Sequence, residues 1–173
     1  SVDCFVIVES KFYHNGKKRD LKFDLNKYPK FKEKIIYIVQ DEEPLNLETV
    51  NKEDDEGTKS YKYIFNAHKR ENFQRNLISK GIEKANEDDL IMISDVDEIP
   101  NLKDLNVARV NNKIVIFEQD IFYYKLNRYL EGFTWHGTKA CKKKNLKSPQ
   151  WIRNVKNKKF GFWRLDTFFS ETK

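Results

Sequence analysis

The chain has 173 residues, of which 39% are hydrophobic and 14% are aromatic. This is enough apolar material for one domain with its own core, so we expect a single domain over residues 1–173 and exclude a disordered chain. The net charge is +6, and most of the excess positive charge lies in residues 11–34 and 139–159. A positive surface attracts anions, although the base composition of a genome explains a Lys- and Asn-rich chain equally well.

The chain has no apolar stretch long enough to span a membrane, and no signal-peptide pattern opens it. We therefore expect a soluble, cytoplasmic protein. Cys4 and Cys141 do not have the spacing of metal ligands. Cys4 lies in an apolar run, where a free thiol is expected to be buried.

Several short apolar runs, each bounded by polar residues, predict buried strands. In chain order they are residues 2–8, 34–39, 89–94, 113–117 and 121–126. Residues 41–57 are acidic and predict an irregular loop, whereas the spacing of apolar residues predicts a helix over residues 67–85. From residue 135 onward the chain is aromatic and basic with weak periodicity. Strands that alternate with helical or loop crossovers predict an α/β domain with a mostly parallel central sheet.

The most informative segment is the acidic one that follows the strand at residues 89–94, Asp95-Val96-Asp97-Glu98. Ligands of open α/β sheets bind at the carboxyl ends of such strands. In an extended backbone Asp95 and Asp97 project to the same side, and two neighbouring carboxylates repel unless a cation lies between them. Mn2+ or Mg2+ suits these oxygens and also binds diphosphate. The segment therefore predicts a metal and donor site, the alternative being a solvated turn that caps a helix near Pro100.

The chain also resembles glycosyltransferase family 17, the family of the bisecting N-acetylglucosaminyltransferase III and its bacterial and viral relatives. The matching segments are residues 2–10 with their terminal Glu-Ser, Gly16 with Leu21-Lys22-Phe23, residues 70–75, residues 88–100 and residues 122–127. The resemblance implies a GT-A-type fold, a UDP-sugar donor (by family precedent UDP-N-acetylglucosamine) and an inverting transfer to a glycan hydroxyl, as in N-glycan processing.

The chain departs from the family pattern in two places. Family members have an earlier strand and helix before the position of Val2, so we expect the chain to lack the first strand and the C-terminal end of the family; a fragment of an anchored eukaryotic enzyme would lie in the Golgi lumen. The family's Gly-Trp-His segment corresponds to residues 161–164, where Arg164 stands in place of the histidine. A guanidinium has no lone pair to offer a metal, so an inactive relative is a second interpretation.

Three residues are candidates for binding the donor. Glu9 ends the first predicted strand and either accepts hydrogen bonds from the nucleoside or is an ordinary solvent-facing residue. Arg75 lies where the family carries an arginine and is a candidate for the diphosphate. Asp95 is a candidate for both donor and metal, with Asp97 as the second metal ligand.

Three further residues are candidates for catalysis and acceptor binding. Glu98 is a candidate general base or a cap of the turn, and Asp120 is a weaker second base, so the base stays unassigned. Trp135 either stacks on the acceptor sugar or packs in the core.

Two other functions compete with the transferase. A phosphatase of the haloacid dehalogenase type also has Asp-X-Asp after an apolar strand, but near the N-terminus and without the Glu-Ile-Pro that follows here. A module that binds glycans or polyanions without catalysis is the non-enzymatic alternative. The chain has no recognisable nucleic-acid motif, so we expect a sugar donor and a glycan acceptor as its partners.

Overall fold

The computed structural model describes residues 2–103, 105–106, 110, 114–125, 127–156 and, for the backbone alone, 170–172. The chain divides into two compact units, Ser1–Lys84 and Ala85–Lys173. The prediction of one domain is not tested by this division and stays a prediction.

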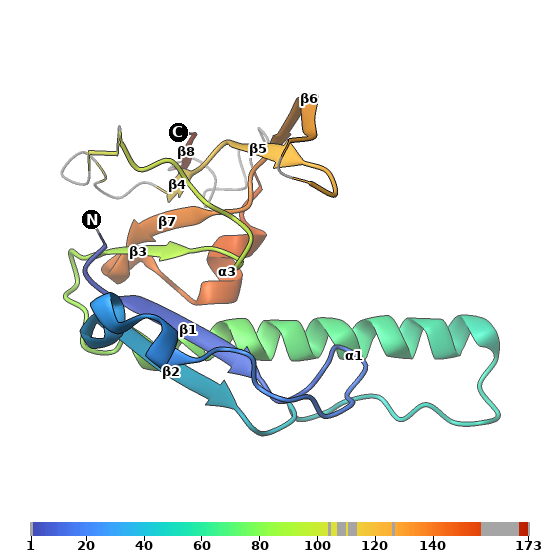
Figure 1. Ribbon diagram of the computed structural model, residues 1–173. Coiled ribbons are helices and arrows are strands. Elements are labelled where there is room, and N and C mark those ends of the chain that lie inside the picture. The colour runs from blue at the N-terminus through green and yellow to red at the C-terminus, as the bar shows by residue number, and fades with distance from the viewer. Residues whose placement is uncertain are drawn as a thin grey trace. The chain divides into compact units, whose positions relative to one another are not determined.

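The first unit is built on a pair of parallel strands, β1 (Phe5–Ser10) and β2 (Ile35–Gln40), which pair from Phe5 opposite Ile35 to Ser10 opposite Gln40. Two 3-10 helices, η1 (Leu25–Lys27) and η2 (Pro29–Lys34), connect them. Helix α1 (Glu56–Asn76) and the short helix α2 (Ile78–Gly81) follow, and α1 runs beside β1 in Figure 1. The side-chain amide of Gln74 donates to the backbone carbonyl of Val8 at 3.1 Å, which ties α1 to β1.

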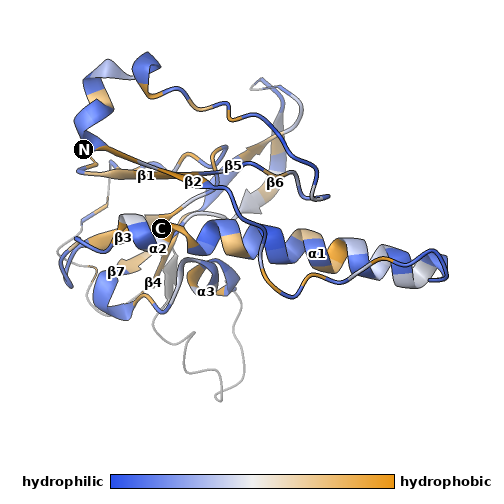
Figure 2. Cartoon of the chain, turned by 90° about the horizontal axis from the view of Figure 1, so that it is seen from below, coloured by the Kyte–Doolittle hydropathy of each residue, from blue (hydrophilic) through white to orange (hydrophobic). Residues whose placement is uncertain are grey.

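Helix α1 begins eleven residues before the predicted helix, because Asp55 caps it by accepting from the amide of Thr58 at 2.9 Å. Three of the four apolar residues of its first half, Tyr61, Tyr63 and Ile64, are more than half exposed, and only Phe65 is half-buried. They therefore produce no apolar stripe, and Figure 2 shows the helix as largely hydrophilic. The periodicity by which a sequence predicts a helix is present only where a face is buried.

The second unit contains a four-stranded sheet in the order β3-β7-β4-β8 and a separate two-stranded hairpin. The sheet strands are β3 (Leu90–Ile93), β4 (Ile114–Ile116), β7 (Lys139–Lys142) and β8 (Ser170–Thr172). The hairpin strands are β5 (Gln119–Phe122) and β6 (Tyr129–Trp135). The 3-10 helix η4 (Lys143–Asn145) and helix α3 (Pro149–Asn154) follow β7. Most of the fully buried side chains of this unit come from the sheet and α3, among them Ile93, Ile116, Cys141 and Ile152.

The mixed α/β class is confirmed, but among the described residues no mostly parallel central sheet forms. Parallel pairs join only β1 to β2 and β4 to β8, while β7 lies antiparallel between β3 and β4. β7 has the sequence Lys-Ala-Cys-Lys, which has the pattern of a basic surface segment, yet Lys139 is only 5% exposed. A short strand with charged ends carries no apolar run, so the sequence did not predict it.

The two cysteines are free, but their exposure differs from the prediction for Cys4, which is exposed, whereas Cys141 is buried. Cys4 precedes β1 and so lies outside the paired part of the apolar run. Within the described residues, no helix has both the length and the apolar composition that crossing a membrane requires.

Candidate functional site

The acidic segment follows β3 directly and forms a closed turn. The amide of Glu98 donates to the carbonyl of Asp95 at 3.1 Å, and the amide of Asp95 donates to Oε2 of Glu98 at 2.9 Å. The hydroxyl of Ser94 donates to the carbonyl of Glu98 at 2.9 Å. The backbone is therefore turned rather than extended, so the argument that Asp95 and Asp97 project to one side because they are two apart is wrong. Val96 and Asp97 occupy the exposed centre of the turn.

A guanidinium from α3 lies against this turn. Nη1 of Arg153 is 2.8 Å from Oε2 of Glu98, and Nη2 is 3.0 Å from Oε1 of Glu98 and 2.7 Å from Oδ2 of Asp95. Nη1 also donates to the backbone carbonyl of Gly137. The side chains of Arg153 and Glu98 are 10% and 5% exposed, so this is a forked ion pair sheltered from water. The single positive charge of Arg153 offsets one of the three carboxylate charges of the turn.

Glu98 is further held by Trp135, whose indole Nε1 donates to Oε1 at 2.7 Å. Burial by itself raises the pKa of Glu98, but hydrogen bonds from Arg153, the Asp95 amide and Trp135, together with the charge of Arg153, outweigh it and hold the pKa below its usual value. A carboxylate with a lowered pKa and occupied oxygens is a weak proton acceptor. These contacts favour the interpretation of Glu98 as the residue that closes the turn; its role as a base stays a prediction.

Gly137 makes this arrangement possible. A β-carbon at this position would collide with the carboxylate of Glu98 and the indole of Trp135. The hydroxyls of Ser94 and Thr138 lie 2.7 Å apart on the same side of the network. Trp135 is half exposed, so one part of its indole is anchored at the turn while the rest faces solvent.

The metal ligands predicted from the sequence are Asp95 and Asp97. Within the described residues, no group of three or more histidine, cysteine, aspartate or glutamate side chains is placed to hold a metal. Asp95 already contacts Arg153, and Asp97 is exposed. Mg2+ needs only one or two carboxylates when substrate phosphates supply the other ligands, so the hard oxygens of this turn fit a cation that arrives with a diphosphate.

Asp120 lies on β5, opposite Thr134 of β6, and is exposed. It belongs to the same unit as the acidic turn, and the hairpin that carries it ends at Trp135. Its role as a base stays a prediction.

The Glu9 carboxylate of the first unit accepts four hydrogen bonds. It accepts from Arg19, the amides of Lys22 and Phe23, and the hydroxyl of Tyr37 at 2.7–2.9 Å. Burial by itself raises the pKa of Glu9, but these four donors outweigh burial and hold the pKa below its usual value. The pKa of Tyr37 rises to about 12 through burial and the hydrogen bond to Glu9. Glu9 therefore fastens the loop after β1 to the sheet.

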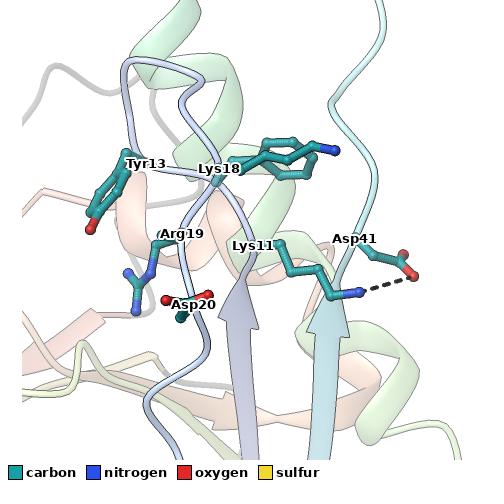
Figure 3. Close-up of a pocket in the computed structure, with 7 residues that line it drawn as sticks. Lys11, Tyr13, Lys18, Arg19, Asp20 and Asp41 are labelled. Atoms are coloured by element: carbon teal, nitrogen blue, oxygen red, sulfur yellow. Dashed lines mark ion pairs between the residues drawn. The ribbon is translucent and has the colours of Figure 1, made fainter.

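A pocket of about 460 Å3 lies at the carboxyl ends of β1 and β2, next to the strand that carries Glu9. Figure 3 shows the ion pair between two of its lining residues, Lys11 and Asp41, the first residues after the two strands, whose Nζ and Oδ2 are 4.0 Å apart. Arg19, which Glu9 holds, lies 5.6 Å from the ring centre of Tyr13. The complete lining is Lys11, Phe12, Tyr13, Lys18, Arg19, Asp20 and Asp41. This basic pocket lies where parallel strands place ligands.

Arg75 pairs with Glu71 one helical turn earlier, at 2.8 Å, and is 11% exposed. Arg70 makes a bidentate pair with Glu43 and donates to the carbonyl of His14 at 3.0 Å. Both arginines thus support the first unit through α1. The donor contact predicted for Arg75 is untested.

Comparison with known proteins decides the family. The model of glycosyltransferase family 17 matches residues 1–154 of the 173. The chain belongs to glycosyltransferase family 17. It is therefore a glycosyltransferase of the N-acetylglucosaminyltransferase kind, and the resemblance inferred from the sequence is confirmed. No curated protein and no solved structure matched the chain.

Family membership implies a UDP-N-acetylglucosamine donor and a glycan acceptor for this family 17 transferase. It supports the transferase interpretation over the phosphatase one. The match spans both units, and it includes β1, the acidic turn and α3.

Sequence reasoning missed two features of the structure, the contact of Arg153 with the acidic turn and the basic pocket of the first unit. Arg153 lies in a basic segment without periodicity, 58 residues after Asp95, and nothing in its neighbours marks it as the partner of an acidic turn. The pocket residues Lys11 and Arg19 had a signal, because they belong to the positive stretch of residues 11–34. The comparison of Arg164 with the family histidine lies outside the described residues.

Proposed function

We propose that this chain is a metal-dependent, inverting transferase with a GT-A-type fold that moves N-acetylglucosamine from UDP-N-acetylglucosamine to a glycan hydroxyl. Membership of family 17 over residues 1–154 supports the donor and the class of acceptor. The observation that carries the assignment of the site is the acidic turn after β3, which Glu98 closes and Arg153 braces. We further propose that the two units work as one transferase domain.

The donor's diphosphate is assigned to Asp95 and Asp97 together with Mn2+ or Mg2+. These two carboxylates would hold the cation, which would supply positive charge to stabilise the leaving UDP. Arg153 keeps Asp95 in a single orientation through the 2.7 Å contact, while Asp97 faces solvent at the centre of the turn. We also propose that Glu9, in the segment that matches the family's Glu-Ser strand end, and Arg75, where the family carries an arginine, bind the donor.

In the transfer step, the acceptor hydroxyl loses its proton as its oxygen attacks C1 of the sugar, and the bond between C1 and the phosphate oxygen breaks with its electron pair leaving on UDP. Because both oxygens of Glu98 already accept bonds from Arg153, we assign the proton to Asp120 and the positioning of the turn to Glu98. Attack from the face opposite the leaving group gives inversion.

The test is transfer and hydrolysis of UDP-N-acetylglucosamine by the wild type and by Asp97→Ala with Mn2+ present. Loss of a metal carboxylate is expected to lower kcat/KM at least 100-fold, with Mn2+ affinity, read by electron paramagnetic resonance, falling in parallel. The matched control is Glu53→Ala, which removes an exposed carboxylate from the loop before α1 and is expected to change neither quantity. Equal turnover by Asp97→Ala and wild type removes the metal-site proposal.

A domain that binds without transfer is the second candidate, and the neutralisation of Asp95 by Arg153 favours it. The two are separated by the metal dependence of UDP binding. A donor site binds UDP only when Mn2+ is present, whereas a basic patch binds UDP and unrelated polyanions without it.

A further inference from the structure

The hairpin of β5 and β6 exposes an unusual number of aromatic rings. Every residue of β6 is exposed, and β5 alternates between exposed and half-buried. We define the aromatic platform as the following rings, with their exposed fractions: Phe122 46%, Tyr123 57%, Tyr124 86%, Tyr129 52% and Phe133 61%. Antiparallel hairpins of soluble proteins ordinarily bury one face. Exposed aromatic rings gathered on one hairpin, two pairs of them in contact, are a candidate binding surface.

We propose that the aromatic platform binds the acceptor glycan, a neutral oligosaccharide whose sugar faces stack on the rings. The inference rests on the proposed transferase function and adds the surface on which the acceptor lies. Figure 1 shows β5 and β6 as a hairpin distinct from the β3-β7-β4 strands of its unit.

The tip of the hairpin is held in a strained conformation that presents a ring. Tyr124 has φ of 61°, and the amide of Lys125 donates to the carbonyl of Tyr123 at 2.8 Å, which is a γ-turn centred on Tyr124. Bulky residues rarely adopt positive φ. Glycine or asparagine suits this backbone better, so folding does not explain a tyrosine that is 86% exposed. Residues strained in this way cluster at active sites and ligand clamps.

The rings are arranged to offer more than one face. Those of Tyr123 and Tyr124 are 4.5 Å apart at 82°, and those of Phe122 and Tyr129 pair across the strands at 5.9 Å. Tyrosine combines a flat apolar face with a hydroxyl at the rim. A pyranose has the same combination, with apolar C–H faces and hydroxyls at the edge, so rings and sugars match in shape and polarity.

The charge of the hairpin favours a neutral ligand. Residues 119–135 contain Asp120 and Glu131 against Lys125 and Arg128, which sum to zero, in a chain of net charge +6. Binding of a phosphate-rich ligand needs a positive surface. The hairpin thus differs in chemistry from the basic pocket after β1 and β2.

Both strands of the hairpin are joined to the acidic turn. β6 ends at Trp135, whose Nε1 donates to Glu98 at 2.7 Å. β5 begins at Gln119, whose side-chain oxygen accepts from the amide of Thr138 at 3.1 Å, and Thr138 contacts Ser94 at 2.7 Å. A glycan on the platform is therefore held on an element that is directly bonded to the turn assigned to the donor. This continuity favours an acceptor over a second copy of the chain.

The test uses the full chain, UDP-N-acetylglucosamine and a neutral mannose- and N-acetylglucosamine-containing oligosaccharide as the probe. Tyr124→Asn removes a ring while suiting the positive φ, and Phe133→Thr removes a ring from β6 while keeping a β-branched residue. Each is expected to raise the acceptor KM about three- to tenfold, leaving kcat and the KM of the donor unchanged. Tyr63→Gln, which removes an exposed ring from α1, is the control and is expected to change nothing.

Direct binding of the oligosaccharide, followed by saturation-transfer NMR on the tyrosine protons, reads the platform without relying on turnover. Unchanged acceptor KM and unchanged binding in both variants, with donor turnover intact, overturn the inference and leave the proposed function standing. No donor turnover, with oligosaccharide binding that the variants weaken, overturns the proposed function and leaves the platform as a glycan site. Concentration-dependent association that the variants abolish, without oligosaccharide binding, shows a self-association surface and also overturns the inference.

Discussion

The contact between Glu98 and Arg153 is the interaction on which the shape of the acidic turn depends most. Both side chains are at least nine-tenths buried, and the carboxylate also receives the Asp95 amide and the Trp135 indole. Burying two charges is costly, but removing one partner leaves the other buried without compensation. An apolar pair of the same size could be as stable, so we attribute to the ion pair mainly the single conformation of the turn.

Glu98→Gln is predicted to lower the free energy of unfolding by about 3–5 kcal/mol at pH 7. Because the pKa of Glu98 is lowered from 4.5 on folding, its stabilisation is fully present above that value and is lost as pH falls through the lower folded pKa. Urea unfolding followed by tryptophan fluorescence between pH 3 and 7 is therefore expected to show a steeper acid loss in the wild type than in the variant.

The control for this prediction is Glu53→Gln, whose carboxylate is exposed, and it is expected to follow the wild-type curve. Parallel curves for Glu98→Gln and wild type, separated by a constant amount, would show that the Glu98 carboxylate does not titrate differently in the folded chain.

At the scale of elements, the close approach of the short helix α2 to strand β1 depends on one glycine, Gly81. α2 packs on β1, and a β-carbon added at Gly81 would collide with the γ-carbons of Val6. Val6 lies within a paired strand and its χ1 is stiff, so it cannot rotate away easily. Glycine lowers helix propensity, and here close approach of helix and strand accounts for it.

Gly81→Ala is predicted to destabilise the first unit by about 1–3 kcal/mol, although alanine is the better helix former. The measurement is the urea midpoint followed by circular dichroism at 222 nm. Ser79→Ala, an exposed change in the same helix, is the control and is expected to stay within about 0.5 kcal/mol of the wild type. A more stable Gly81→Ala protein would contradict the packing argument.

At the scale of the whole molecule, each unit carries one free cysteine, and the two differ in exposure. Cys4 is exposed, while Cys141 is 0% exposed in the middle of β7, and burial raises its pKa to about 12. Only the thiolate reacts with disulfide reagents. Cys141 is thus a natural reporter of the opening of the second unit.

A disulfide reagent at pH 8 is predicted to modify one thiol per native chain rapidly, at Cys4, and the second only at the rate at which β7 is released. Mass spectrometry of the labelled peptides assigns the order, and Cys4→Ser leaves a chain with only the slow phase. Equal rates for both thiols in the native protein would show that β7 is not protected between β3 and β4.

Parts of this protein followed from local sequence alone. The apolar runs before Glu9, Gln40 and Ser94 became β1, β2 and β3 within a few residues of the predicted limits. The acidic segment followed its strand as expected, and the motifs of residues 2–127 were sufficient to indicate the family. Such features are readable because hydrophobic periodicity and motif spacing are properties of neighbouring residues.

The partners of those residues were decided by the tertiary structure. No residue near Asp95 or Glu98 in the chain indicates that Arg153 will pair with them. The backbone there forms a closed turn instead of the extended conformation that we expected. Likewise Lys-Ala-Cys-Lys became a central strand only because β3 and β4 offered open edges on either side. Long-range pairing is set by burial and by charges brought together on folding, which leave no periodic trace in the sequence.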